Sequence, residues 1–114
     1  MSSYDPLDIR GQEKARAERE LRDRLDYETE GEDIKWLMSD KRGRRVLWRL
    51  MDRAGVFRSS FNTNALAMAF AEGERNYGLR LMYRIHKLCP NLYPVMMKEN
   101  GNERTNSDTS GNNQ

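Results

Sequence analysis

Several arginines crowd into DKRGRRVLWRLMDRAGVFRSSF, residues 40–61, where apolar residues stand between them. A guanidinium group can hold phosphate or carboxylate oxygens through two parallel hydrogen bonds, so this stretch could bind an anionic partner. Four of the arginines follow helical spacings of three, four and four and form one stripe: Arg42, Arg45, Arg49 and Arg53. We interpret this arginine stripe as a candidate site for nucleic acid or for an acidic protein surface.

A second interpretation of the arginine stripe stays open. Arginine stems commonly cover apolar surface while their charged ends stay hydrated, so the stripe could be only the solvated side of a helix. Readout of specific DNA bases is not indicated, because no helix-turn-helix, zinc-finger or RNA-recognition pattern accompanies the stripe.

The residues that could carry catalysis or hold a metal stand singly along the chain. His86 is the only histidine, and its turn carries no second histidine or carboxylate at ligand spacing. Cys89 is the only cysteine, so one chain can form no disulfide, and a nucleophilic role would need a base brought to it by folding. We expect both side chains to be structural, and we expect no enzymatic activity, no metal and no other cofactor.

The four arginines form a stripe only if this segment is a helix, and an apolar row in the same segment predicts that helix. The row follows the spacing of a single helix face and comprises Val46, Leu47, Leu50, Met51 and Ala54. It lies opposite the stripe, and Gly55 stands where a helix commonly ends in the left-handed conformation. The sequence therefore predicts an amphipathic helix that buries this row and ends before Val56.

The longest predicted helix begins within residues 62–64 and ends before Pro90. Its apolar positions recur at spacings of three and four: Leu66, Phe70, Gly73, Tyr77, Leu81, Ile85 and Leu88. We predict that this row is the central core stripe. Gly73 and Gly78 each cost about 1 kcal/mol of helix propensity relative to alanine, and we expect close approach of a neighbouring helix to offset that cost.

The N-terminal third favours helix but offers little to bury. Oppositely charged residues recur at helical-neighbour spacing in residues 11–27, and the only apolar line there is Ala17, Leu21 and Leu25. We predict a solvated helix, with docking onto a partner as the alternative. Residues 28–31 should interrupt it. A short helix at 33–38 should then supply bulk for burial: Ile34, Trp36 and Leu37.

Charge divides the chain into three parts. Residues 1–30 hold six basic and nine acidic residues (net −3), residues 31–100 hold thirteen and seven (net +6), and residues 101–114 hold one and two (net −1). We predict a charged N-terminal helical arm at 1–30, a helical core domain at 31–100 and a disordered polar tail at 101–114. The fold class is all-α, a small helical bundle of about four to five helices.

The same features limit the kinds of partner. No apolar run reaches the length of a bilayer-spanning helix, and residues 1–12 lack the basic start and apolar block of a secretory signal, so we expect no membrane partner. The basic core allows an acidic partner such as DNA, and it also allows contact with the acidic arm of another copy. A homo-oligomer would suit a chain with so small a core.

Methionine is frequent, with seven residues in the chain. We expect most of them to fill gaps between helices, as this flexible side chain commonly does. For Met96 and Met97 the alternative is an adaptable contact patch near the C-terminal end of the core domain.

Three blocks of the sequence, taken in order, resemble a known family. They are GRRVLWRL, AGVFRSSF and EGERNYGL, and YPVMMKEN follows them. The span from Asp33 to Glu99 is similar to a family of small proteins of tailed phages and prophages, first labelled from a Bordetella podophage gene and termed Bbp19-like. The resemblance implies a short all-helical protein encoded near the head and portal genes of a short-tailed phage. It implies no enzyme and brings no catalytic or ligand-binding residues with it.

On this resemblance we expect a virion or head-assembly protein that binds other phage structural proteins, namely portal, capsid or internal proteins. Such a protein would be found in the virion, or in the host cytoplasm during assembly. The alternative, from a different class, is a DNA-binding accessory that uses the arginine stripe without sequence preference.

Overall fold

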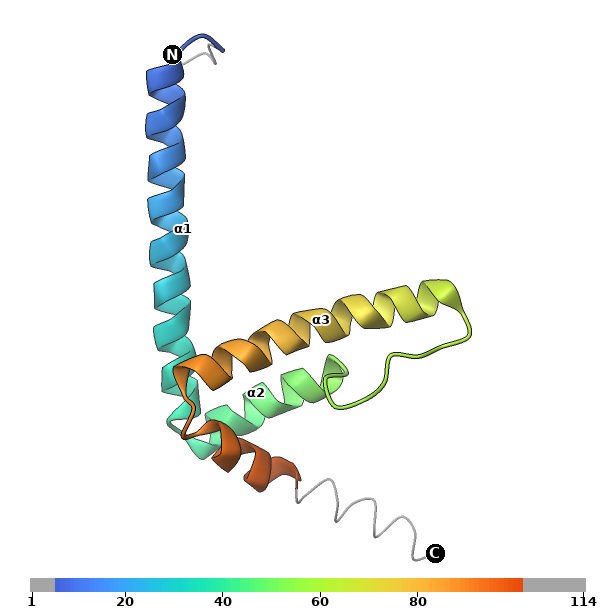
Figure 1. Ribbon diagram of the computed structural model, residues 1–114. Coiled ribbons are helices and arrows are strands. Elements are labelled where there is room, and N and C mark those ends of the chain that lie inside the picture. Colours follow the sequence, from blue (N-terminus) through green and yellow to red (C-terminus); the bar gives the residue numbers. More distant parts are fainter. Residues whose placement is uncertain (1–5, 102–114) are drawn as a thin grey trace, which may run out of the picture. The chain divides into compact units, whose positions relative to one another are not determined.

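The computed structural model describes residues 6–101, and within that range α-helix is the only regular secondary structure (Figure 1). The three long helices are α1 (Ile9–Met38), α2 (Lys41–Arg53) and α3 (Ala65–Leu88), and a fourth helical segment covers residues 93–101. The all-α prediction is therefore confirmed. The predicted polar tail lies outside the described residues, apart from Gly101. The chain divides into two compact units, Met1–Glu32 and Asp33–Gln114, which are described separately.

The first unit contains most of α1, and its side chains are largely exposed. Leu21 and Leu25 are half exposed, and the ion pair between Arg16 Nε and Glu20 Oε1, at 3.8 Å, lies on the surface. Exposed pairs of this kind stabilise a helix only slightly. This part of α1 therefore relies on the helix propensity of its residues rather than on a buried face.

The interruption predicted at residues 28–31 is wrong, because α1 runs through these positions as α-helix. The prediction gave too much weight to Gly31. A single glycine costs about 1 kcal/mol in a helix interior, and good helix formers, Glu28, Glu30 and Glu32, surround it.

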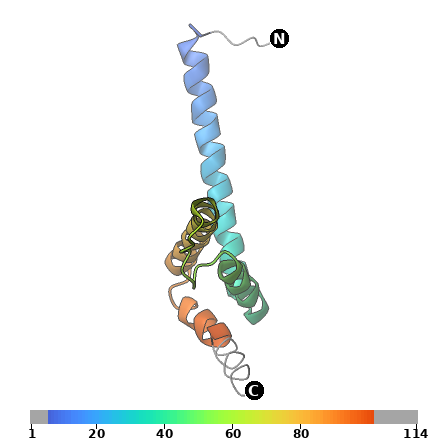
Figure 2. The same ribbon diagram turned by 90° about the vertical axis from the view of Figure 1, so that its right-hand side faces the viewer.

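The second unit holds the hydrophobic core. Its fully or nearly fully buried apolar side chains come from the end of α1, from α2, from the following loop, from α3 and the residue after it, and from the C-terminal segment (residues 93–101). They are Ile34, Met38, Leu47, Met51, Val56, Ile85, Cys89 and Met96. Within this unit α2 and α3 run side by side in opposite directions, joined by residues 54–64 (Figures 1 and 2). The core is thus small and draws on every helical element of the unit.

Local signals at the ends of α2 and α3 act as the sequence predicts. Gly55 follows α2 with φ of 87°, a left-handed conformation that glycine adopts readily. Asn64 begins α3, and its side-chain oxygen accepts hydrogen bonds from the backbone N–H groups of Leu66 and Ala67 at 3.0 and 3.1 Å. These two signals fix the bounds of the loop between the helices.

Two glycines allow close packing in this unit, Gly43 against a neighbouring backbone and Gly78 against two side chains. A Cβ atom added to Gly43 would lie 1.9 Å from the carbonyl oxygen of Leu37, at the end of α1. A Cβ atom added to Gly78 would lie 2.6 Å from Val56 Cγ2 and 2.8 Å from Ala54 Cβ. Close packing at Gly78 is confirmed.

The prediction of close packing at Gly73 is wrong, because a Cβ atom there would meet nothing within 4 Å. The first half of the predicted core stripe is also exposed: Leu66 at 84%, Phe70 at 72% and Tyr77 at 69%. The reason is that α3 packs closely at Gly78 against Ala54 and Val56, which follow the end of α2. That contact turns the Gly78 side of the helix inward and the Gly73 side outward.

Three further side chains expected in the core are exposed. Trp36 is 74% exposed, Val46 43% and Leu50 48%. In α2 the buried row consists of Gly43, Leu47 and Met51. The apolar row seen in the sequence is wider than the face that α2 buries, so its outer edge remains at the surface.

Gly43→Ala should lower the free energy of unfolding by about 1–3 kcal/mol, because the added methyl group would force two backbones apart. Arg42→Ala, at the neighbouring exposed position, should change it by no more than about 0.5 kcal/mol. Urea unfolding followed by circular dichroism measures both values. Equal stability of Gly43→Ala and the unmodified chain would contradict the close contact.

Candidate partner-binding surface

The arginine stripe lies on the outward side of α2. Arg42, Arg49 and Arg53 are exposed and Arg45 is half-buried. Among residues 6–101, no ion pair or side-chain hydrogen bond engages any of these four guanidinium groups. The stripe therefore presents four cations that no described residue pairs, and three of them belong to exposed residues.

Val46 and Leu50 give this surface an apolar edge. Successive helix residues are about 100° apart around the axis. Val46 and Leu50 therefore lie beside Arg49 and Arg53, along one edge of the stripe. Both apolar side chains are close to half exposed. We call this combination, Arg42, Arg45, Val46, Arg49, Leu50 and Arg53, the α2 outer face. Sequence reasoning found its arginines and missed its two apolar members, because they also fit a core row.

Arg44 differs from the arginines of the stripe, because it is built into the fold. Its Nε donates to Glu99 Oε1 at 2.6 Å, its Nη2 donates to Glu99 Oε2 at 3.2 Å, and its Nη1 donates to the carbonyl oxygen of Met38 at 2.9 Å. The Arg44 and Glu99 side chains are only 12% and 18% exposed. This residue therefore joins α2 to the end of α1 and to the C-terminal segment.

The pair also changes the acidity of its members. The hydrogen bond from Arg44 lowers the pKa of Glu99, and the charges of Arg44 and Lys41 act in the same direction, against the opposing effect of burial. The same hydrogen bond raises the pKa of Arg44. The sequence offered no signal for this contact, because the partners lie 55 residues apart.

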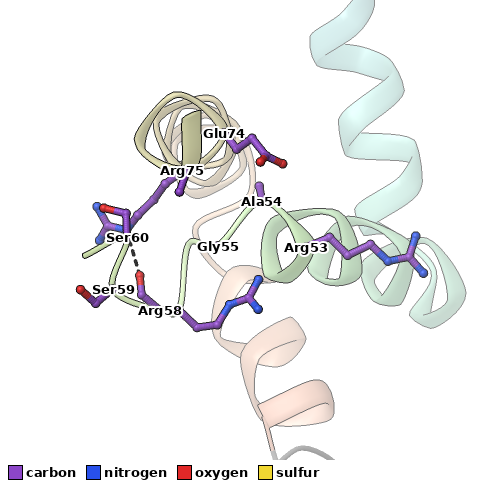
Figure 3. Close-up of a pocket in the computed structure, with 9 residues that line it drawn as sticks. Arg53, Ala54, Gly55, Arg58, Ser59, Ser60, Glu74 and Arg75 are labelled. Atoms are coloured by element: carbon purple, nitrogen blue, oxygen red, sulfur yellow. Dashed lines mark hydrogen bonds between the residues drawn. The ribbon is translucent and has the colours of Figure 1, made fainter. Parts of the chain in front are cut away.

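A pocket of about 260 Å³ follows the end of α2, and residues from the loop and from α3 line it. Three arginines contribute, Arg53, Arg58 and Arg75, but Figure 3 shows their side chains pointing in different directions. Arg58 Nη2 donates to the carbonyl oxygen of Asp52 at 2.7 Å, and Arg75 Nε donates to the carbonyl oxygen of Arg58 at 3.2 Å. These two arginines fasten the loop, so the pocket does not gather cations around one anion.

The single histidine and cysteine lie at the end of α3. The ring of His86 packs edge-on against Tyr93 at 5.0 Å between centroids. Cys89 is buried, and burial raises the pKa of its thiol against the lowering effect of the Lys35 charge. Residues 6–101 contain no group of three or more His, Cys, Asp or Glu side chains placed to hold a metal ion.

The suggested contact patch at Met96 and Met97 does not fit the structure. Met96 is fully buried in the core, and Met97 is half-buried against it. Both side chains fill space between helices. In the part of the chain that the structure describes, no helix combines the length and apolar character needed to cross a membrane.

Arg44→Ala should lower the free energy of unfolding by about 2–3 kcal/mol, because it leaves the Glu99 carboxylate and the Met38 carbonyl without their donor in a largely buried setting. Arg49→Ala, on the exposed face of the same helix, is the matched control and should cost no more than about 0.5 kcal/mol. A double-mutant cycle with Glu99→Ala measures the coupling by urea unfolding. Strictly additive effects would contradict the pairing.

The stability of the protein should fall in acid partly through Glu99. Because the folded protein holds the pKa of Glu99 below its ordinary value of 4.5, the ion pair contributes fully above that pH. Its contribution is lost as the pH falls through the lowered pKa. Glu99→Gln should therefore show a shallower loss of unfolding free energy below pH 4.5 than the unmodified chain. Identical pH profiles for the two proteins would be inconsistent with a lowered pKa.

Comparison with known proteins identifies the second unit. The family model described as Bbp19-like phage protein matches residues 34–98. No curated protein and no solved structure matches the chain. The matched span contains α2, α3 and both partners of the Arg44 contact to α1, and it stops one residue before Glu99. Since the match covers more than half of the 114 residues, the chain belongs to the Bbp19-like phage protein family.

Proposed function

We propose that this phage protein is a non-enzymatic interaction module of the virion or of head assembly, and that it binds another phage protein through the α2 outer face. The observation that carries the proposal is a row of unpaired arginines flanked by two half-exposed apolar side chains. Arginine is enriched at the centres of protein interfaces, where its stem packs on apolar surface and its head group pairs with carboxylates.

The contrast between Arg44 and the stripe supports a binding role. Arg44 donates three hydrogen bonds to other residues of the unit, so it is an example of an arginine with a structural role. The four arginines of the stripe make no such contacts with residues 6–101. Solubility alone does not call for four cations of one sign along a single helix face, and opposite charges are usually interspersed on such surfaces.

The chemistry of the surface describes the partner that fits it. Carboxylates spaced by about one helical turn, 5.4 Å, would meet successive arginines. A shallow apolar strip beside those carboxylates would cover Val46 and Leu50. We propose portal, capsid or internal proteins of the phage as the partners, with the virion or the assembling head as the place of binding. Membership in a family of phage proteins supports a phage partner but names none.

A DNA-binding accessory is the second candidate. The net charge of +6 in residues 31–100 and the unpaired guanidinium groups favour it. Binding to phosphates through these groups would weaken steeply with added salt and would depend little on base sequence. The apolar members of the α2 outer face are better suited to a protein surface, and this places the DNA-binding function second.

Mass spectrometry with copy-number determination, applied to purified virions and procapsids of the encoding phage, tests the proposal. We expect the protein at a fixed number of copies in at least one of the two particles. Arg49→Glu should lower that number because it reverses a charge at the centre of the α2 outer face. Lys98→Glu, which reverses one exposed charge on the C-terminal segment, should leave it unchanged.

Absence from both particles would contradict the proposal. A companion titration with unrelated duplex DNA addresses the second candidate. Affinity that falls steeply with salt and is lost on Arg49→Glu would support a DNA-binding role, and a flat salt response would exclude it.

A further inference from the structure

A row of exposed side chains on α3 packs against no other helix among residues 33–101. The row consists of Leu66, Phe70, Gly73 and Tyr77, and its three side chains are each more than two-thirds exposed. Gly73 has open space where its Cβ atom would be. The guanidinium carbon of Arg80, on the same helix, lies over the Tyr77 ring at 5.7 Å from its centroid.

The opposite side of the same helix is already occupied. Gly78 and Ile85 are buried, and Met82 packs against the core beside them. The helix α3 therefore has an apolar row on each of two sides, and only one of these is covered. A helix that is apolar on both sides is normally buried on both, and large exposed apolar patches mark interaction sites.

The spacing of the exposed row points to a second copy of this chain as its occupant. The intervals along the row are four, three and four residues, and they read the same in both directions. We propose that α3 pairs with α3 of a second copy, antiparallel and about a two-fold axis. In this register Phe70 of each copy lies over the partner's Gly73, and Leu66 lies against the partner's Tyr77. A two-fold interface requires this kind of self-complementary surface.

The gap at Gly73 distinguishes the antiparallel arrangement from a parallel one. In a parallel pair, glycine would face glycine and leave a void, while the two Phe70 rings would compete for the same space. In the antiparallel pair each void receives an aromatic ring. The distribution of charge agrees with this choice. Residues 65–71 carry no charge, and in the antiparallel pair they would lie opposite residues 72–78 of the partner, which contain Glu72, Glu74 and Arg75.

The size of the row is adequate for a dimer of modest affinity. Three large side chains in this state of exposure present on the order of 400 Å² per copy, so two copies bury about 800 Å² in total, the size of a weak, reversible interface and less than the roughly 1,000 Å² of a stable one. The row lies on α3 and not on the α2 outer face. Self-association therefore neither requires nor excludes the proposed binding to another phage protein.

Sedimentation equilibrium of the full chain over micromolar concentrations tests the inference. We expect a reversible monomer–dimer equilibrium for the unmodified protein. Phe70→Glu should raise the dimer dissociation constant at least about tenfold, since it places a charge in the apolar contact. Tyr83→Glu is the matched control, because Tyr83 is a similarly exposed aromatic residue of α3 outside the row, and it should leave the equilibrium unchanged.

Gly73→Leu separates loss of the dimer from loss of the fold. The open space at Gly73 accepts a side chain in the monomer and leucine favours helix, so far-ultraviolet circular dichroism should show a helix content at least as high as before. The same side chain fills the space meant for the partner's Phe70, so the dimer should weaken by at least about tenfold.

Three outcomes would overturn the inference. They are a monomer at every concentration, a dimer that Phe70→Glu and Gly73→Leu leave intact, and a dimer that Tyr83→Glu weakens as much as Phe70→Glu does.

Discussion

The contact of Arg44 with Glu99 and with the end of α1 is the interaction on which the second unit most depends. Gly43 lets the first turn of α2 approach the backbone at Leu37. Its neighbour Arg44 then reaches the carbonyl oxygen of Met38, the last residue of α1. The final carbonyl groups of a helix lack partners within the helix and carry partial negative charge, so a guanidinium group is well suited to them. The same side chain holds the C-terminal segment through Glu99.

This arrangement allows a small core to define a fold. Among residues 6–101 only eight apolar side chains are buried, yet they come from four helical elements and the two connections on either side of α3. Hydrophobic contacts are not directional, whereas the two-pronged contact between Arg44 and Glu99 fixes the angle and register of the segments that it joins. The consequence for function is that α2 is held firmly from one side. Its other side remains exposed, with the arginine stripe, Val46 and Leu50 on it.

The sequence predicted well which segments are helices and where two of them begin or end. It predicted less well which face of each helix is buried. Gly55 and Asn64 act through local backbone geometry and local hydrogen bonds, so their effect can be read without knowing the rest of the fold. The exposure of Phe70 and Leu50 could not be read in this way. An apolar row shows that a face can be buried, but which of two rows meets a neighbour depends on distant contacts such as the one at Gly78. For the candidate site, the arginines of the stripe were predictable from their spacing. The different role of Arg44 was not, because Glu99 is remote in sequence.

The central claim is that the α2 outer face binds a protein of the phage particle. Hydroxyl-radical footprinting of the chain, free and bound to purified phage particles, tests it most directly. Oxidation of Val46 and Leu50 should drop on binding, while oxidation of Val95, which is exposed to a similar degree on the C-terminal segment, should stay constant. Unchanged oxidation of Val46 and Leu50 in the bound protein would contradict the claim and place the contact elsewhere on the chain.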